Sequence, residues 1–305
     1  MIPGKEKQIK GKKTVTNNTD IKLATLFDLE MIEKGLYRGE SWDLGFRALF
    51  GGQVLAQSLT AASRTVDNAR FCNSFHSYFL LPGDASKPVV YDVENVRDGR
   101  SFSTRRVKAI QNGKNIFYMT ASFQTVENGL VHQYANMPEV PAPHDLVSDI
   151  THYEKNKHKL SAKMQEVLAY HKPIDFRSVK AVEGDVQQEQ APVRHIWLKA
   201  NEKLGQDIAL NQAALAYASD YHFLTTALMP HGIHPSDKEL AIATIDHAMW
   251  FHRPIQFDEW LLYVIDAPST GNARGFVRGE FFDREGNLVA SAAQEGLLRL
   301  RKNKN

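Results

Sequence analysis

Two long segments of the chain are apolar on nearly every side. They cover residues 47–66 and 211–229, are rich in alanine and contain no proline. An amphipathic surface helix would show one polar face, whereas a helix that is apolar all round is typical of a buried position. We therefore predict two buried helices, one in each half of the chain.

A block of strand-like runs follows each apolar segment, at 74–123 and at 246–294. Each block contains a turn between two such runs, Asn112-Gly113 in the first and Glu285-Gly286 in the second. Asn-Gly between strand-like runs is a strong hairpin signal. The pattern predicts long antiparallel strands in both halves.

The two blocks also match each other in sequence. Phe79 and Pro82 correspond to Phe251 and Pro254 at one common step of 172 positions. A sheet that curls around a helix requires a helix that is apolar all round, which each half supplies. We predict an α+β protein with two antiparallel sheets, each wrapped around a long apolar helix.

The rest of the chain divides around these two units. Residues 1–20 form a basic stretch that we expect to be disordered, and 21–126 form the N-terminal unit. Residues 127–171 are rich in proline and then polar, which predicts a linker carrying one surface helix. The C-terminal unit, 172–302, is expected to carry the catalytic residues.

Composition and charge narrow the function. A formal charge of +2 over 305 residues gives no reason to expect a nucleic-acid partner. No apolar run approaches the roughly 20 residues that span a bilayer, and the N-terminus lacks the apolar segment of a secretory signal. Cys72 is the single cysteine, so a disulfide within the chain is excluded and a reducing compartment fits. We expect a cytoplasmic protein in which Cys72 is a core residue.

Four histidines, His231, His234, His247 and His252, lie close together in sequence. Their spacing matches no metal-binding motif and no cysteine ligand lies near, so we expect no metal and no cofactor. We predict that Asp246 and His247 hold hydrogen bonds of their strand and that His252 faces water or a partner subunit.

Asp220 is the most unusual residue of the second apolar segment. A lone carboxylate is costly to bury unless other groups hold it, and the pattern places Asp220 in the interior of the predicted helix. The matching position of the first half is the uncharged Thr60. The repeat therefore preserves the scaffold and adds a carboxylate to one copy, as an active site on a duplicated frame would.

Two further positions share this asymmetry. Thr244 stands where the first half has Cys72, and Gln294 stands where it has Phe123 or its neighbour. A carboxylate can accept a proton while a hydroxyl and an amide orient an attacking oxygen. None of the three is a strong nucleophile, so the set favours direct attack by water.

Several long blocks resemble acyl-CoA thioesterase II, the TesB-type double-hotdog family. Among them are FHSYFLLPGD, YASDYHFLTTALMPHG, IATIDHAMWFHRP and ARGFVRGEFFDREGNLVASAAQEG, and the likeness covers roughly residues 25–300. The resemblance implies a tandem hotdog fold and hydrolysis of fatty acyl-CoA to free acid and CoA. It implies an Asp–Thr–Gln catalytic set, which falls on Asp220, Thr244 and Gln294 through the SDxxFL, ATIDH and QEG blocks.

Four residues are candidates for substrate binding. Gly51 and Gly52 would bring the start of the first helix close to another backbone, and N–H groups there could stabilise an oxyanion. Arg274 and Arg278 could contact the phosphates of CoA, although they read equally well as exposed strand arginines.

Two other functions are compatible with the same frame. An enoyl-CoA hydratase would use a histidine with a carboxylate, and His76 or His247 could serve. A non-enzymatic acyl-CoA binding protein is the second alternative, although a buried charge would not help it to hold an apolar tail. In each case exposed sheet edges favour a homo-oligomer, a dimer or a tetramer.

Overall fold

The computed structural model describes residues 22–155, 158, 173–180, 189–235 and 237–301. The predicted basic tail, 1–20, lies outside the described residues. The predicted linker helix is described only in its first part, where α3 covers Asp149–Lys155.

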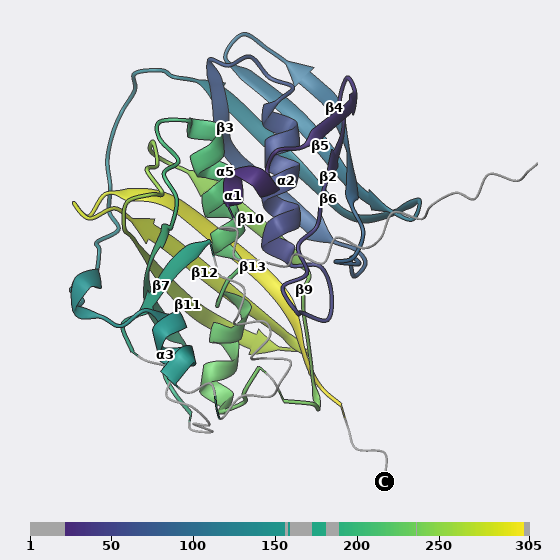
Figure 1. The fold of residues 1–305 in the computed structure, drawn as a ribbon. Coiled ribbons are helices and arrows are strands. Elements are labelled where there is room, and N and C mark those ends of the chain that lie inside the picture. Colours follow the sequence, from purple (N-terminus) through teal and green to yellow (C-terminus); the bar gives the residue numbers. More distant parts are fainter. Residues whose placement is uncertain (1–21, 156–157, 159–172, 181–188, 236, 302–305) are drawn as a thin grey trace, which may run out of the picture.

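Within the described residues the strands form one antiparallel sheet of 13 strands (Figure 1). Its order is β1-β2-β4-β5-β6-β3-β10-β13-β12-β11-β8-β7, and β9 pairs with β13 beside this path. The strands are β1 Glu30–Glu33, β2 Leu36–Gly39, β3 Arg70–Phe79, β4 Val89–Asp98, β5 Phe102–Gln111, β6 Lys114–Thr125, β7 Ile174–Ser178, β8 Val193–Ala200, β9 Leu240–Thr244, β10 Asp246–Phe251, β11 Leu261–Gly271, β12 Arg274–Phe282 and β13 Leu288–Leu300. The helices are α1 Leu23–Leu26, α2 Gly51–Ser63, α3 Asp149–Lys155 and α5 Ile208–Ser219, with 3-10 turns η1 Pro143–Asp145 and η3 Leu224–His231.

Each half of the sheet curls around buried helical residues. The strands before the linker pack on α2, whereas β11, β12 and β13 pack on η3, which follows α5 in the chain. The helices α2 and α5 lie side by side in the middle of the molecule (Figure 1). The α+β class is confirmed. The two predicted sheets are in fact joined edge to edge, because β3 pairs with β10.

The junction of β3 and β10 has the register of a local two-fold axis. His76 pairs with Ala248, and Ala248 is also the residue that corresponds to His76 in the repeat, 172 positions later. The flanking pairs obey the same symmetry. Ser74 pairs with Trp250, and the residues that correspond to these two in the repeat, Asp246 and Tyr78, also pair with each other. The two halves therefore face each other as the subunits of a symmetric dimer would, and the start of each helix approaches the end of the other.

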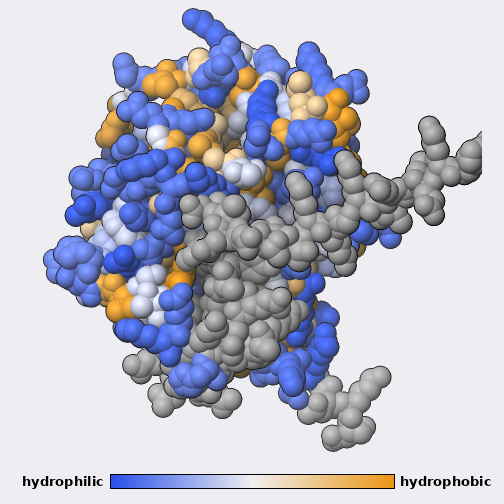
Figure 2. All heavy atoms as spheres, viewed as in Figure 1, coloured by the Kyte–Doolittle hydropathy of each residue, from blue (hydrophilic) through white to orange (hydrophobic). Residues whose placement is uncertain are grey.

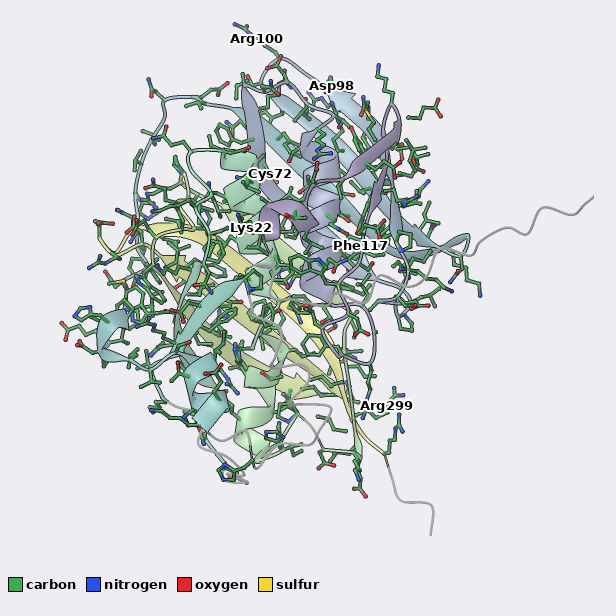
Figure 3. The ribbon with its side chains drawn as sticks, viewed as in Figure 1. Lys22, Cys72, Asp98, Arg100, Phe117 and Arg299 are labelled. Carbon is green, nitrogen blue, oxygen red and sulfur yellow. The ribbon has the colours of Figure 1, made fainter. Side chains whose placement is uncertain are left out.

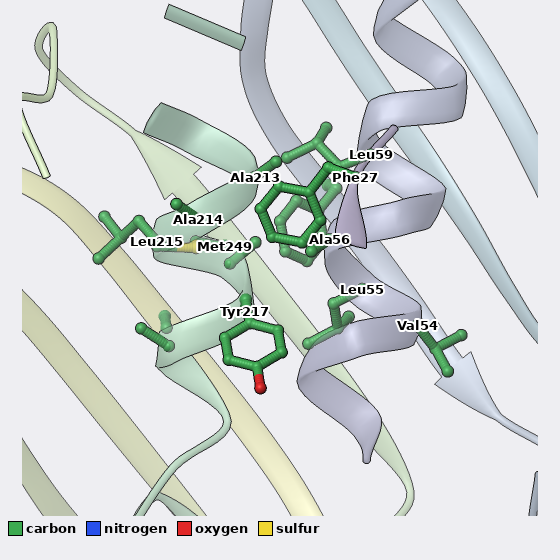
Figure 4. Packing of buried hydrophobic residues seen from close by; sticks show 14 of the residues in the cluster. Phe27, Val54, Leu55, Ala56, Leu59, Ala213, Ala214, Leu215, Tyr217 and Met249 are labelled. Atoms are coloured by element: carbon green, nitrogen blue, oxygen red, sulfur yellow. The ribbon is translucent and has the colours of Figure 1, made fainter. Parts of the chain in front are cut away.

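Small side chains allow α2 and α5 to pack closely. Leu55 and Ala56 from α2 face Ala214 and Tyr217 from α5, all fully buried (Figure 4). The two backbones approach closely at Gly52, where an added Cβ atom would lie 2.3 Å from the carbonyl oxygen of Tyr217. A side chain at this position would force the helices apart.

The second apolar segment is not one continuous helix, contrary to the prediction for 211–229. The helix α5 ends at Ser219, and Asp220 is its C-cap residue. Two residues later His222 adopts a left-handed backbone, with φ of 61°, which an α-helix cannot contain. The hydroxyl groups of Thr225 and Thr226 both donate to the carbonyl oxygen of His222 and fix this turn. Asp220 therefore lies at a helix end rather than in a helix interior.

Part of the linker covers the outer face of the second half. Met137 and Val140 pack against a small cluster made by Trp197, Leu262 and Phe282. The face in Figure 2 is mostly hydrophilic, with apolar patches over the first half of the sheet. In the described part of the chain no helix has the length and hydropathy needed to cross a membrane.

The contact of α2 with α5 can be tested by substituting Gly52. We expect Gly52→Ala to lower the free energy of unfolding by about 1–3 kcal/mol, the usual cost of overpacking. Alanine is the better helix former by about 1 kcal/mol, so a loss of stability would report the clash and not helix propensity. The measurement is urea denaturation followed by circular dichroism.

Gly129→Ala is the matched control, because nothing lies within 4 Å of its added Cβ atom. This variant should unfold at the urea concentration of the wild type. A Gly52→Ala protein as stable as the wild type would show that the helices are not in close contact.

Candidate active site

Asp220 lies where the end of α5 meets the start of α2. Its carboxylate accepts a hydrogen bond from the backbone N–H of Gly52. A Cβ atom on Gly51 would lie 2.6 Å from Asp220 Oδ2, so the carboxylate is in contact with the helix backbone itself. The structure thus brings Asp220 together with both glycines singled out in the sequence, although these three residues come from different halves.

The two helices are capped in different ways. The N-cap residue of α2, Phe50, has no side-chain hydrogen bond to the helix. In α5 the N-cap residue Asp207 accepts a hydrogen bond from the N–H of Leu210 at 3.0 Å. The free N–H groups and the positive end of the dipole make an uncapped helix start favourable for an anion. Asp220 occupies this place on α2 from across the junction.

Thr244 and Gln294 complete the group. Gln294 Nε2 donates to Thr244 Oγ1 at 3.0 Å, and the same amide donates to the carboxylate of Asp220. Gln294 is buried, whereas Thr244 and Asp220 keep some exposed surface. The structure therefore brings the three residues predicted to be catalytic into one hydrogen-bonded cluster.

A β-bulge directs Thr244 toward this cluster. Thr244 pairs with Gly296 and Ala248 pairs with Ala293, so β13 advances three positions while the opposite chain advances four. The extra residue shifts the alternation of side chains by one position. Asp246 Oδ1 accepts the N–H of Glu295 at 2.7 Å within the bulge, in agreement with the prediction that Asp246 holds strand hydrogen bonds.

Burial raises the pKa of Asp220 from its ordinary 3.8 to about 7. The hydrogen bonds from Gly52 and Gln294 oppose this rise only in part. Burial also raises the pKa of Tyr263 well above its ordinary value, and the negative charge of Asp220 adds to that effect. The site therefore contains a carboxylate whose proton affinity suits a general base near neutral pH.

His247 also belongs to this cluster. The sequence interpretation gave it strand hydrogen bonds or, in the hydratase alternative, a catalytic role, and did not place it beside Gln294. Its Nδ1 lies 2.7 Å from Gln294 Oε1 and its Nε2 lies 3.0 Å from Ser219 Oγ. The side chain is fully buried, and burial lowers its pKa to about 4. The signal was present in the repeat, because the counterpart of His247 in the first half is the apolar Phe75.

Arg274 and Arg278 lie on the opposite face of the sheet. Both are exposed, as is Phe276 between them, and they alternate along β12 with the buried Gly275, Val277 and Gly279. Arg274 Nε lies 2.9 Å from Glu295 Oε1, and Arg278 Nη2 lies 2.6 Å from Asp266 Oδ2. The structure does not bring them to the cluster around Asp220. Their contact with CoA phosphates stays a prediction that this geometry does not support.

The corresponding place in the first half is closed. Cys72 lies on β3 beside the central helices (Figure 3), fully buried, and burial raises the pKa of its thiol. Gln212 Nε2 donates to the carbonyl oxygen of Cys72 at 2.7 Å, and Thr60 Oγ1 donates to Ala56 within its own helix. The polar cluster is therefore present in only one of the two symmetric places.

The other histidines of the sequence cluster lie apart from one another. His231 Nε2 is 2.8 Å from Thr270 Oγ1, and His252 Nε2 is 2.9 Å from Ser291 Oγ. Among the residues that the structure describes, no three or more His, Cys, Asp or Glu side chains are placed to hold a metal ion.

This architecture is the hotdog fold in tandem. A solved protein from Alicyclobacillus acidocaldarius described as having a hot dog fold aligns with a TM-score of 0.75 and 19% identity, over 92% of this chain and 98% of its own. At that level of identity the likeness concerns the fold alone.

Sequence comparison then identifies the family. The acyl-CoA thioesterase model matches residues 162–297, and the model for its N-terminal domain matches 39–124. The chain is 41% identical over 278 residues to acyl-CoA thioesterase 2 of Haemophilus influenzae, covering 91% of this chain and 96% of that protein. The crystal structure of acyl-CoA thioesterase II TesB2 from Mycobacterium marinum aligns with a TM-score of 0.74 and 38% identity, over 92% and 99% of the two chains. The chain belongs to the acyl-CoA thioesterase family and is a thioester hydrolase.

The raised pKa of Asp220 makes a prediction about stability. Between about pH 4 and pH 7 the folded protein holds a proton that the unfolded chain releases, so stability falls as the pH rises through this range. Asn cannot ionise, and its oxygen can still accept the N–H of Gly52. We expect Asp220→Asn to melt at least about 2 °C above the wild type at pH 8, since one kcal/mol shifts the Tm of a large domain by about 2–4 °C.

At pH 4 this advantage of Asp220→Asn should vanish. Scanning calorimetry at the two pH values measures it, with Glu127→Gln on an exposed carboxylate as the control. The melting temperature of Glu127→Gln should differ from that of the wild type by the same small amount at pH 4 and at pH 8. An equal effect of pH on the wild type and on Asp220→Asn would mean that the carboxylate is not held in a buried site.

Proposed function

We propose that the chain hydrolyses fatty acyl-CoA thioesters to free fatty acid and CoA by direct attack of water. The single observation that carries this mechanism is the hydrogen-bonded cluster of Asp220, Gln294 and Thr244 at the uncapped start of α2. Membership of the thioesterase family supports the substrate class.

In the proposed step ionised Asp220 accepts a proton from a water molecule. The hydroxyl of Thr244 orients that water toward the thioester carbonyl, and the amide of Gln294 orients Thr244 and Asp220 by donating to both. A C–O bond forms, the carbonyl oxygen takes the negative charge, and the C–S bond then breaks to release the thiolate of CoA. A thiolate is a good leaving group, so no general acid is required.

The start of α2 is suited to stabilise the developing oxyanion. It points the positive end of a helix dipole at the site, and preorganised dipoles act strongly where water is excluded. A covalent intermediate on the enzyme has little support, because the thiol of Cys72 lies in the other half and remains protonated.

Apolar side chains surround the same end of α2. Phe79 would lie 3.1 Å from a Cβ atom on Gly51, and Leu80 and Leu81 follow it with about half of their surface exposed. Phe46, also half exposed, stacks on Phe50 with ring centroids 5.6 Å apart. We propose these residues as contacts of the acyl tail, for which each buried methylene contributes about 0.8 kcal/mol.

We also propose a cytoplasmic location and a homo-oligomeric assembly. The single buried cysteine is compatible with the cytoplasm. The edge strand β1 exposes Met31 and Ile32, which supports a symmetric homo-oligomer. Multi-angle light scattering on the full chain measures the assembly, and a monomer at micromolar concentration would exclude the oligomer.

The catalytic set is tested by following thiol release from decanoyl-CoA. Asp220→Asn should lower kcat by roughly 10²–10⁴-fold, the usual contribution of a general base. Thr244→Val and Gln294→Leu should each lower it by roughly 10–100-fold through poorer positioning of water. Thr120→Val, an exposed threonine of β6, is the matched control and should keep the wild-type rate.

The pH dependence gives an independent readout of the same mechanism. Asp220 must be ionised to act as a base, so kcat/KM of the wild type should rise with pH around a midpoint of about 7. Full activity of Asp220→Asn would remove that residue from the mechanism. Loss of the enoyl chromophore of crotonyl-CoA without thiol release would instead indicate a hydratase, and tight binding with neither reaction would indicate a binding protein.

A further inference from the structure

His247 connects the two elements that carry the proposed catalytic residues. One ring nitrogen reaches Gln294 on β13, and the other reaches Ser219, the residue before Asp220 at the end of α5. Tyr263 fixes the same point, because its hydroxyl donates to the carbonyl oxygen of Ser219 at 3.0 Å. His247 is thus bonded on both sides within the buried part of the site.

The hydrogen bond at Nδ1 determines which way the amide of Gln294 faces. An amide oxygen can only accept, so the contact of Gln294 Oε1 with His247 Nδ1 requires a proton on that nitrogen. With the oxygen held there, the Nε2 protons of Gln294 point to Thr244 and to Asp220. In the reverse orientation the amide oxygen would face the carboxylate and repel it.

The repeat indicates that this position does not need a histidine for folding. The counterpart Phe75 is fully buried in the same place of the first half, and its ring stacks on His247 at a centroid distance of 6.1 Å. Burying an imidazole is costly in comparison with a phenyl ring. The polar ring occurs only in the half that contains Asp220, Thr244 and Gln294.

We propose that His247 is a positioning residue for the hydrolysis, which it serves by holding the amide of Gln294 with both N–H groups toward the water-activating cluster. The inference rests on the proposed function, and it adds a role that the Asp–Thr–Gln set does not include. His247 takes no proton from the substrate water.

Three tyrosines and His247 near Asp220 keep their charge state in the range from pH 5 to 9. Burial raises the pKa of Tyr217, Tyr221 and Tyr263 above that range and lowers the pKa of His247 to about 4. Beyond them, His222 lies 3.8 Å from Asp149 of α3, and Asp246 and Glu295 meet at the bulge. Substitutions at His247 leave His222, Asp149, Asp246 and Glu295 in place. A change in the pH profile of kcat/KM among His247 variants therefore reports the coupling of His247 to Asp220.

The test compares two polar replacements at one position. The amide N–H of Asn can stand in for Nδ1–H, whereas the longer Gln places its amide near the position of Nε2. We expect His247→Asn to keep kcat for decanoyl-CoA within about fivefold, and His247→Gln and His247→Phe to lose roughly 10–100-fold, with KM changed less than about threefold. His252→Asn, on the outer side of the sheet, is the control and should match the wild type.

The acid limb of kcat/KM distinguishes positioning from a packing defect. Without the donor at Nδ1 the amide no longer stabilises ionised Asp220, so the midpoint should move up by roughly one pH unit in His247→Gln and His247→Phe. His247→Asn should restore the wild-type midpoint. Equal profiles for the Asn and Gln variants would overturn the proposal, as would wild-type kcat in His247→Phe.

A measurement on the resting enzyme completes the test without using activity. The proposal requires the neutral Nδ1–H tautomer of His247, which ¹⁵N chemical shifts of the imidazole ring identify, with His247→Asn providing the assignment. The Nε2–H tautomer would overturn the proposal even in an active thioesterase. Absence of thiol release from the wild type, with the Nδ1–H tautomer present, would refute the proposed function and leave the hydrogen bond established.

Discussion

The contact between Asp220 and the first turn of α2 is the constraint on which the site depends. The helix begins without a side-chain cap of its own, and its two leading glycines leave the backbone open to a carboxylate from the other half. The same carboxylate therefore caps the start of a helix and has a pKa of about 7. Holding that charge in a partly buried place reduces stability at the pH where the enzyme works, which is the usual exchange between stability and activity.

The duplication explains why only one such contact exists. The register of β3 with β10 relates the halves by a local two-fold axis, so each helix start should meet the end of the other helix. At the second meeting point, however, Asp207 caps its own helix and Gln212 fills the space beside Cys72. The backbone repeats, and side chains decide which copy can bind a reacting group.

Much of this arrangement could be read from the sequence, because the features concerned are local or repeated. The apolar helices and hairpin turns follow from composition and spacing, and comparing the copies isolated Asp220, Thr244 and Gln294. The end of α5 could not be predicted, since no glycine or proline marks it and the break depends on the left-handed backbone of His222. The position of His247 beside Gln294 was missed for a related reason. Strict alternation places residues three apart on opposite faces, but the bulge after Thr244 directs both Thr244 and His247 inward.

The groups that orient Gln294 and Asp220 are notable for being neutral. Lys or Arg beside the carboxylate would hold it ionised but would lower its pKa and weaken it as a base. Backbone N–H, an amide and a neutral imidazole instead give directional hydrogen bonds and leave burial as the main influence on its pKa. Arg274 and Arg278 of the same half lie on the outer face of the sheet, paired with carboxylates. Separating orientation from charge in this way lets one buried carboxylate be well positioned and still basic enough to deprotonate water.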